Sequence, residues 1–296
     1  MTGPGAAYRD FPMPAALVSS AGSWLADPDR PVVPARPSAS VLLLRDGARG
    51  IEVFVQRRAS TMAFAPDVLA YPGGGVDPRD ADIDVPWVGP APSVWSGVLG
   101  MPQAAARQVV LAAVRELFEE CGVLLAGPHG GGLVDDLSDP SWRSDRASLL
   151  DRTSSLTELL VRRHLVLRAD LLSAVGRWIT PECEPRRYDT VFFAAGMPSA
   201  QVADGCTTES VRSRWVAAAD ALAERSSGAE LMLPPTQVLA EQLAAAAQVG
   251  DVLVQRPGLH SVLPWPVQHH GSLWMRAPVD DRGHGIPIAD KPAAGE

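Results

Sequence analysis

A helical pattern of hydrophobic and polar positions leads up to Gly122. Apolar side chains recur there at helical spacing, which predicts one face packed into a core. These apolar residues are Val110, Ala113, Val114, Leu117 and Cys121. Three carboxylates, Glu116, Glu119 and Glu120, stand at i, i+3 and i+4 and therefore share a different face. Gly122 occupies the position where a left-handed residue commonly ends a helix, so we expect the helix to stop there.

Strands are predicted on both sides of this helix. Residues 38–45 form a largely apolar run that predicts a buried strand, and residues 51–57 predict a second strand after a short turn, most simply as a hairpin. The remaining elements are expected as strands at 174–179, 188–194 and 214–216, and as helical stretches within 144–168, 218–224 and 234–248. Proline stands in the first turn of the last helix, as is common at helix starts. This mixture indicates an α/β fold.

Three regions lack a sustained pattern. Residues 1–37 contain several prolines and are expected to form an N-terminal arm that lies on the domain or is partly disordered. Residues 78–103 are expected to form a surface excursion with little regular structure, whose Trp87 and Trp95 either pin it to the domain or stack on a substrate. Residues 251–296 are expected to be an irregular C-terminal extension, which leaves residues 38–250 as the main domain.

Composition narrows the classes of partner. The chain has 296 residues, 46% hydrophobic content and a formal net charge of −8, which provides an ample core and argues against nucleic acid as a partner. No apolar run approaches the roughly 20 residues that span a bilayer, so no membrane partner is expected. Three cysteines without metal-ligand spacing fit a reducing cytosol, and a cytoplasmic location is expected. Lys291 is the single lysine, so arginine must provide most phosphate contacts.

The carboxylates on one helical face predict a metal site. Like charges at i,i+4 destabilise a helix by roughly 0.2–0.5 kcal/mol per pair, a cost that a bound hard cation would reverse. Gly73 to Gly75 form a glycine turn earlier in the chain, where the backbone can approach a ligand closely. Such oxygen ligands suit Mg²⁺ or Mn²⁺ and phosphoanhydride cleavage, in which the metal neutralises charge and activates water. The alternative is a solvated acidic face.

The segment from Arg115 to Val123 resembles the second half of the Nudix box, G-x5-E-x7-R-E-U-x-E-E-x-G-U with U aliphatic, at every position. Residues 71–77, Tyr-Pro-Gly-Gly-Gly-Val-Asp, resemble its first half. Arg115 lies 41 positions after Gly74, whereas the box allows 14, so about 27 residues are inserted within the motif. Eight positions before Arg115 the chain has Arg107, so one box glutamate is expected to be missing or displaced.

This resemblance implies a fold and a set of roles. The fold is an α/β/α sandwich with a mixed β-sheet, here carrying the box insertion and an extra C-terminal helix. The implied metal ligands are Glu116, Glu119, Glu120, the carbonyl of Gly73, and Glu209, which precedes a predicted tryptophan-bearing strand and is also a candidate base. Arg115 is implied to orient the carboxylates. An exposed loop position is the alternative for Glu209.

The resemblance also indicates a branch. Residues 56–66, the large insertion and residues 187–193 together resemble the peroxisomal-type coenzyme A diphosphatases with an interrupted box. Coenzyme A or an acyl derivative is therefore the expected substrate, and ADP-ribose, NADH or a nucleotide sugar is the alternative. A Nudix-fold module that binds a nucleotide without cleaving it is another. Arg57, Arg58, Arg186 and Arg187 are candidates for phosphate binding, with surface salt bridges as their alternative. A homodimer is the default expectation.

Overall fold

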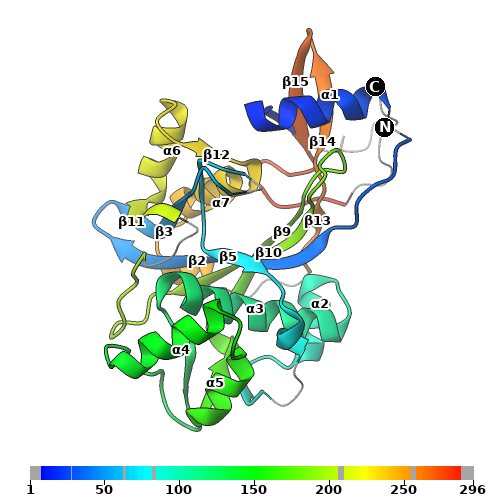
Figure 1. Cartoon of the computed structure of the whole chain (residues 1–296). Coiled ribbons are helices and arrows are strands. Elements are labelled where there is room, and N and C mark those ends of the chain that lie inside the picture. The colour runs from blue at the N-terminus through cyan, green and yellow to red at the C-terminus, as the bar shows by residue number, and fades with distance from the viewer. Residues whose placement is uncertain are drawn as a thin grey trace, which may run out of the picture.

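A mixed β-sheet forms the centre of the protein (Figure 1). The computed structural model describes residues 8–27, 29–62, 65–81, 85–205, 210–254 and 258–287. The main path of the sheet follows the order β12-β4-β3-β2-β10-β9-β13, with β11 paired to β3 and β5 paired to β2. Its strands are β2 (Arg36–Gly47), β3 (Gly50–Arg58), β4 (Val68–Ala70), β5 (Gly73–Gly75), β9 (Ser173–Ile179), β10 (Tyr188–Gly196), β11 (Ser210–Ala217), β12 (Leu231–Met232) and β13 (Ser261–Val262).

Helices cover both faces of this sheet. The helices are α1 (Val18–Ala26), α2 (Pro92–Leu99), α3 (Gln103–Cys121), α4 (Pro140–Leu150), α5 (Leu156–Arg162), α6 (Ala218–Ser226), α7 (Pro234–Ala245) and the short α8 (Val249–Val252). Figure 1 shows α2, α3, α4 and α5 on one side of the sheet and α6 with α7 on the other. The predicted α/β/α sandwich with a mixed sheet, a box insertion and an additional C-terminal helix is therefore confirmed.

The alternation of side chains along β2 explains the two layers. Val41 and Leu43 are buried in the cluster beneath α3, whereas Leu42 and Leu44 are buried in the cluster with α7, because successive residues of a strand point to opposite faces. A strand that is buried on both faces appears as the continuous apolar run seen in the sequence. The predicted hairpin is confirmed, since β2 pairs antiparallel with β3, while β10 lies parallel to β2 on its other side.

The insertion is more regular than its composition indicates. Its α2 helix places Trp95 in the core with no exposed surface, in an edge-to-face contact with Phe193 at 5.7 Å between ring centroids. Val98 and Leu99 are buried on the same face at helical spacing, so the expectation of an irregular surface loop is wrong for this part. Trp95 therefore pins the insertion to the domain. The two-residue strand β6 (Trp87–Val88) joins β7 (Ala126–Pro128) and β8 (Leu165–Arg168) in a separate small sheet.

The two ends of the chain also build regular structure. Strand β1 (Arg9–Pro12) pairs antiparallel with β15 (Ser272–Ala277), which pairs with β14 (Trp265–His269), and α1 lies beside this sheet in Figure 1. The N-terminal arm therefore lies on the domain, and the C-terminal extension is not irregular where it is described. The first of the two alternatives for the arm therefore holds, whereas the expectation of an irregular C-terminal extension is wrong, because its strands pair with each other and with β1, which is distant in the sequence. No helix among the described residues is long and apolar enough to cross a bilayer.

Candidate active site

The α3 helix lies against β2 and β5 and carries three glutamates on its face next to β5. Glu116, Glu119 and Glu120 are only 8%, 7% and 5% exposed, although each carries a carboxylate. The opposite face of α3 is fully buried in the core, as its apolar spacing predicts. Gly122 adopts the left-handed conformation at φ 68° and ends the helix. The core thus fixes the direction in which the three carboxylates point.

The glycine turn lies directly against these carboxylates. Strand β5 pairs antiparallel with Ser38 to Ser40 of β2, and the N–H of Gly73 donates a hydrogen bond of 2.9 Å to Oε2 of Glu120. A Cβ atom on Gly74 would lie 2.5 Å from the carboxylate of Glu116, so a larger residue would displace that group. Glycine therefore lets the turn approach this carboxylate without displacing it, and the turn and the acidic helix face form one site.

Arg115 joins the parts of this site. Its Nη1 donates to Oε1 of Glu116 at 2.8 Å and to Oε2 of Glu119 at 3.1 Å, and its Nη2 donates to the carbonyl of Gly75 at 2.8 Å. Burial alone would lower the pKa of this guanidinium, but the adjacent carboxylates outweigh that effect and raise it. Arg115 is therefore a permanent positive charge at the centre of the carboxylates.

Asp80 provides the carboxylate that pairs with Arg115. Its carboxylate is 3% exposed, accepts hydrogen bonds from Nε and Nη2 of Arg115 at 3.0–3.3 Å, and also accepts one from the N–H of Asp77. Asp80 lies six positions after Gly74, which is where the box has its first glutamate when it is counted from the glycine side. Of the two expected outcomes, a missing or a displaced box carboxylate, the contacts of Asp80 support displacement, with an aspartate in place of the glutamate. The inserted residues follow Asp80 in the sequence. Counting eight positions back from Arg115 therefore ends at Arg107 and does not reach Asp80.

The oxygen atoms at this site are of the kind that a divalent cation binds. Oε1 of Glu119 is buried without a hydrogen-bond partner, and burial raises the pKa of this carboxyl despite the opposing effect of Arg115. A buried carboxylate oxygen without a partner is costly, and a hard cation would satisfy it. Within the described residues, no three acidic, histidine or cysteine side chains already converge as a metal site. Glu116 and Glu119 both accept hydrogen bonds from Arg115, which holds these two carboxylates together.

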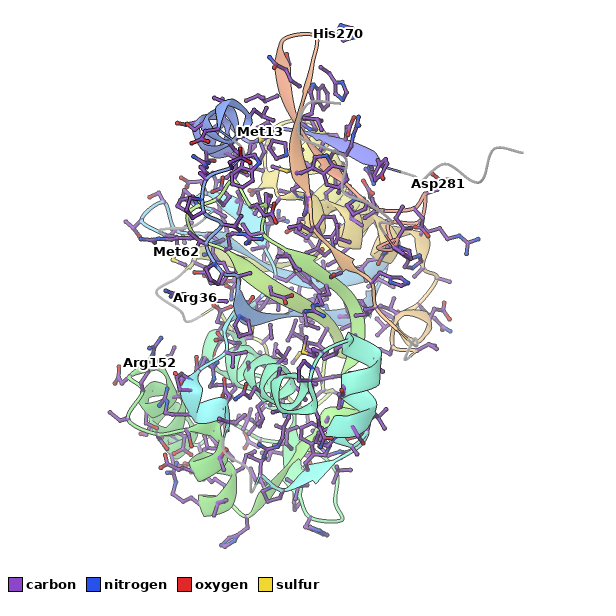
Figure 2. The ribbon with its side chains drawn as sticks, turned by 90° about the vertical axis from the view of Figure 1, so that its right-hand side faces the viewer. Met13, Arg36, Met62, Arg152, His270 and Asp281 are labelled. Atoms are coloured by element: carbon purple, nitrogen blue, oxygen red, sulfur yellow. The ribbon has the colours of Figure 1, made fainter. Side chains whose placement is uncertain are left out.

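A cavity of about 1270 Å³ opens beside these groups, and Glu116, Glu119 and Arg115 line it. Of the four arginines expected to bind phosphate, only Arg58 is among the lining residues. The other lining arginines, which the sequence reading missed, are Arg36, Arg79, Arg152 and Arg225. Figure 2 shows Arg36 and Arg152 one below the other along one side of the molecule. Arg36, Arg152 and Arg225 lie outside any motif, so tertiary structure alone brings them to the cavity, whereas Arg79 lies next to Asp80 in the first half of the box.

The other three candidate arginines lie elsewhere. Arg187 is buried and donates to the carbonyls of Thr180 and Val33, so we correct its expected role to a structural one. Arg57 lies 3.8 Å from Glu230, and Arg186 is exposed outside the cavity lining. Glu209 falls outside the described residues.

The sheet, the acidic helix and the glycine turn are those of the Nudix hydrolase class. The family model described as the NUDT19 Nudix domain matches residues 91–242, more than half of the chain, and the chain belongs to this family. The matched range begins after the glycine turn and after Asp80, so the first half of the box lies outside it.

Individual proteins support this assignment. The chain is 29% identical over 216 residues to "Putative nudix hydrolase 7" of Caenorhabditis elegans, covering 73% of this chain and 62% of that protein. It is 27% identical over 281 residues to the human acyl-coenzyme A diphosphatase NUDT19, covering 80% of this chain and 70% of the human protein. A crystal structure of a NUDIX hydrolase from Alicyclobacillus acidocaldarius matches with a TM-score of 0.63 and 28% identity, over 76% of this chain and 99% of that chain.

Proposed function

We propose that this protein is a divalent-metal-dependent hydrolase that cleaves the diphosphate linkage of coenzyme A or an acyl-coenzyme A. The observation that carries the proposal is the contact between the carboxylates of α3 and the glycine turn at one end of a large cavity. The human relative, named an acyl-coenzyme A diphosphatase, supports this choice of substrate. Mg²⁺ and Mn²⁺ are the ions that suit these ligands.

The residues of this site have distinct tasks in the proposed reaction. Glu116, Glu119 and Glu120, with the carbonyl of Gly73, would hold the cation, which when bound neutralises the diphosphate and activates water. Arg115 fixes the carboxylates of Glu116 and Glu119 by direct hydrogen bonds. Arg36, Arg152 and Arg225 line the cavity and would bind phosphate oxygens through forked hydrogen bonds, whereas Arg79 donates to Asp77 and to the carbonyl of Ser154. Glu209 remains a proposed additional ligand or base.

Two alternatives follow from the same site. A cavity of this size with an acidic metal end also suits ADP-ribose, NADH or a nucleotide sugar. The second alternative, a module that binds a nucleotide without cleaving it, was suggested by Arg107 at the position of a box glutamate. Asp80 supplies a carboxylate that binds Arg115 in place of that glutamate. A catalytic site is therefore favoured.

A substrate panel tests the proposal. The purified protein is incubated with coenzyme A, acyl-coenzyme A, ADP-ribose, NADH and nucleotide sugars in Mg²⁺ or Mn²⁺, and the products are separated by chromatography. We expect adenosine bisphosphate and a phosphopantetheine product from coenzyme A, and no product in EDTA.

Glu119→Gln and Glu120→Gln are each expected to lower kcat by about 100-fold or more, as removal of a group that stabilises transition-state charge does. Asp220→Asn, which removes an ion pair to Arg49 outside the cavity, is the control. Turnover that persists in EDTA would contradict the proposal.

A further inference from the structure

The cavity beside the glutamates has a second, apolar end. Its lining continues from the acidic edge of α3 to the opposite face of the sheet, where side chains of the α7 cluster form what we call the apolar chamber. The chamber is lined by Met13, Leu17, Tyr71, Phe192, Met232 and Met275. One continuous cavity therefore has a charged end and an apolar end, which matches a ligand with a diphosphate and a long apolar group.

Methionine is concentrated around this cavity. Four of the seven methionines of the chain line it, namely Met13, Met62, Met232 and Met275. Figure 2 shows Met13 above Met62 and both above Arg36 and Arg152, along the same side of the molecule. Methionine side chains are unbranched and flexible, and they form surfaces that accept apolar ligands of variable shape. Such a lining suits a flexible alkyl chain better than it suits one rigid ring.

Half of the six lining residues named for the chamber come from segments near the two ends of the chain. Met13 and Leu17 come from the segment between β1 and α1, and Met275 comes from β15, which pairs with β1. These residues lie outside the 91–242 range that matches the family model. The arm and the C-terminal strands thus add an apolar wall to a site whose charged end is built by the Nudix box.

We infer that the apolar chamber binds the acyl group of an acyl-coenzyme A, and that Met13 determines the acyl length that the enzyme accepts. This inference rests on the proposed function, which sets the orientation of the substrate in the cavity. The diphosphate lies at the glutamates, and the acyl group points toward the N-terminal arm and β15. Met13 is only partly buried, so its side chain can be changed without opening the core. Each further methylene of the acyl chain that is buried in the chamber is expected to strengthen binding by about four-fold.

Variants of Met13 test the inference by kinetics. Met13→Trp fills the chamber, and we expect kcat/KM for palmitoyl-coenzyme A to fall by about ten-fold or more while kcat/KM for free coenzyme A stays within about two-fold. Met13→Ala, which enlarges the chamber, is expected to retain turnover of palmitoyl-coenzyme A and to shift the preference toward longer acyl chains. Val18→Trp, at an exposed position of α1 outside the cavity lining, is the matched control. Equal losses for free and acylated coenzyme A would overturn the inference, because the chamber would then hold a different part of the substrate.

Photo-crosslinking tests the chamber without turnover. Palmitoyl-coenzyme A with a diazirine at the end of its acyl chain is irradiated with the wild-type protein in EDTA, and the modified peptides are mapped by mass spectrometry. We expect adducts on the peptides containing Met13, Met232 or Met275 that excess unlabelled palmitoyl-coenzyme A suppresses. Adducts confined to other surfaces, or none at all, would overturn the inference. If the wild-type protein cleaves no coenzyme A compound, the proposed function fails, and the crosslinks still decide whether the chamber binds an acyl chain.

Discussion

At the scale of single residues, the ion pair of Asp80 and Arg115 joins the two halves of the interrupted Nudix box. Both side chains are almost completely buried, and Arg115 also holds Glu116 and Glu119. A buried charge without its partner is strongly destabilising, whereas a complete network can be close to neutral. The carboxylate of Asp80 is therefore needed to balance Arg115, although it lies on the far side of the insertion. It is a positioning residue, since its contact with the carboxylates is made through Arg115.

Asp80→Asn should lower both stability and activity. We expect the free energy of unfolding in urea to fall by about 3 kcal/mol, because the substitution removes one partner of a buried pair. The kcat of diphosphate cleavage should fall as the glutamates lose their fixed orientation. The dependence of the rate on Mg²⁺ concentration should shift to higher concentrations, which a purely global loss of stability would not cause in the folded fraction. Asp80→Glu keeps the charge and should recover part of both quantities. An Asp80→Asn protein with unchanged stability and metal dependence would contradict this role.

The residues of the site differ in how far the sequence reveals them. Glu116, Glu119 and Glu120 were predicted because their spacing is local to one helix and needs no knowledge of the rest of the chain. Asp80 was missed because its partner lies 35 positions away across an insertion. Arg187 was assigned to phosphate for its charge, but its two carbonyl partners come from distant segments that no local pattern shows.

At the scale of elements, α2 shows that the insertion is part of the core. It contacts α3, and Trp95 lies beneath it against Phe193 of β10. The helix is short and preceded by prolines and glycines, so its composition resembles that of a loop. Trp95, Val98 and Leu99 nevertheless follow helical spacing, which was the available signal. Longer elements such as α3 and the β2–β3 hairpin were predicted because their patterns repeat over more residues.

Trp95→Ala should destabilise the whole domain. We expect a loss of about 3–5 kcal/mol in the free energy of unfolding, as is typical when a large buried aromatic side chain is truncated. Val94→Ala, on the exposed side of the same helix with Val94 51% exposed, should change it by less than about 0.5 kcal/mol. Chemical denaturation followed by circular dichroism measures both. Equal small effects in the two variants would show that α2 does not contribute to the core.

At the scale of the whole molecule, the two ends of the chain meet in one sheet and enclose the apolar chamber. Strand β1 contacts the rest of the protein through its pairing with β15, and Asp10 of β1 accepts two hydrogen bonds from Arg276 of β15 at 2.8 and 2.9 Å. His269 of β14 lies 3.1 Å from the same carboxylate. These contacts join segments that are separated by most of the sequence, which explains why neither end of the chain showed its strands locally.

The pairing of these ends should depend on pH through Asp10. The hydrogen bonds from Arg276 hold the pKa of Asp10 below its usual value, despite the opposing effect of partial burial. A carboxyl group with a lowered pKa in the folded state stabilises the protein above its unfolded pKa of about 3.9, and this contribution is lost as the pH falls through the folded value. Asp10→Asn should therefore be less stable than the wild type at pH 7 by up to about 1 kcal/mol, as for other partly exposed pairs. The difference should shrink progressively below about pH 4.

A double-mutant cycle isolates this pair from the other acidic groups. Asp10→Asn, Arg276→Gln and the double variant are unfolded in urea at pH 7 and at pH 3, and the coupling free energy is taken from the four proteins at each pH. We expect a favourable coupling at pH 7 that is weaker at pH 3, because Asp10 is then largely protonated in the unfolded state and part of the stabilisation by its ionised carboxylate is lost. If the sheet of the two chain ends forms the wall of the chamber, Asp10→Asn should raise KM for long acyl-coenzyme A more than for free coenzyme A at pH 7. A coupling that does not change with pH would show that the carboxylate charge of Asp10 does not hold the two ends together.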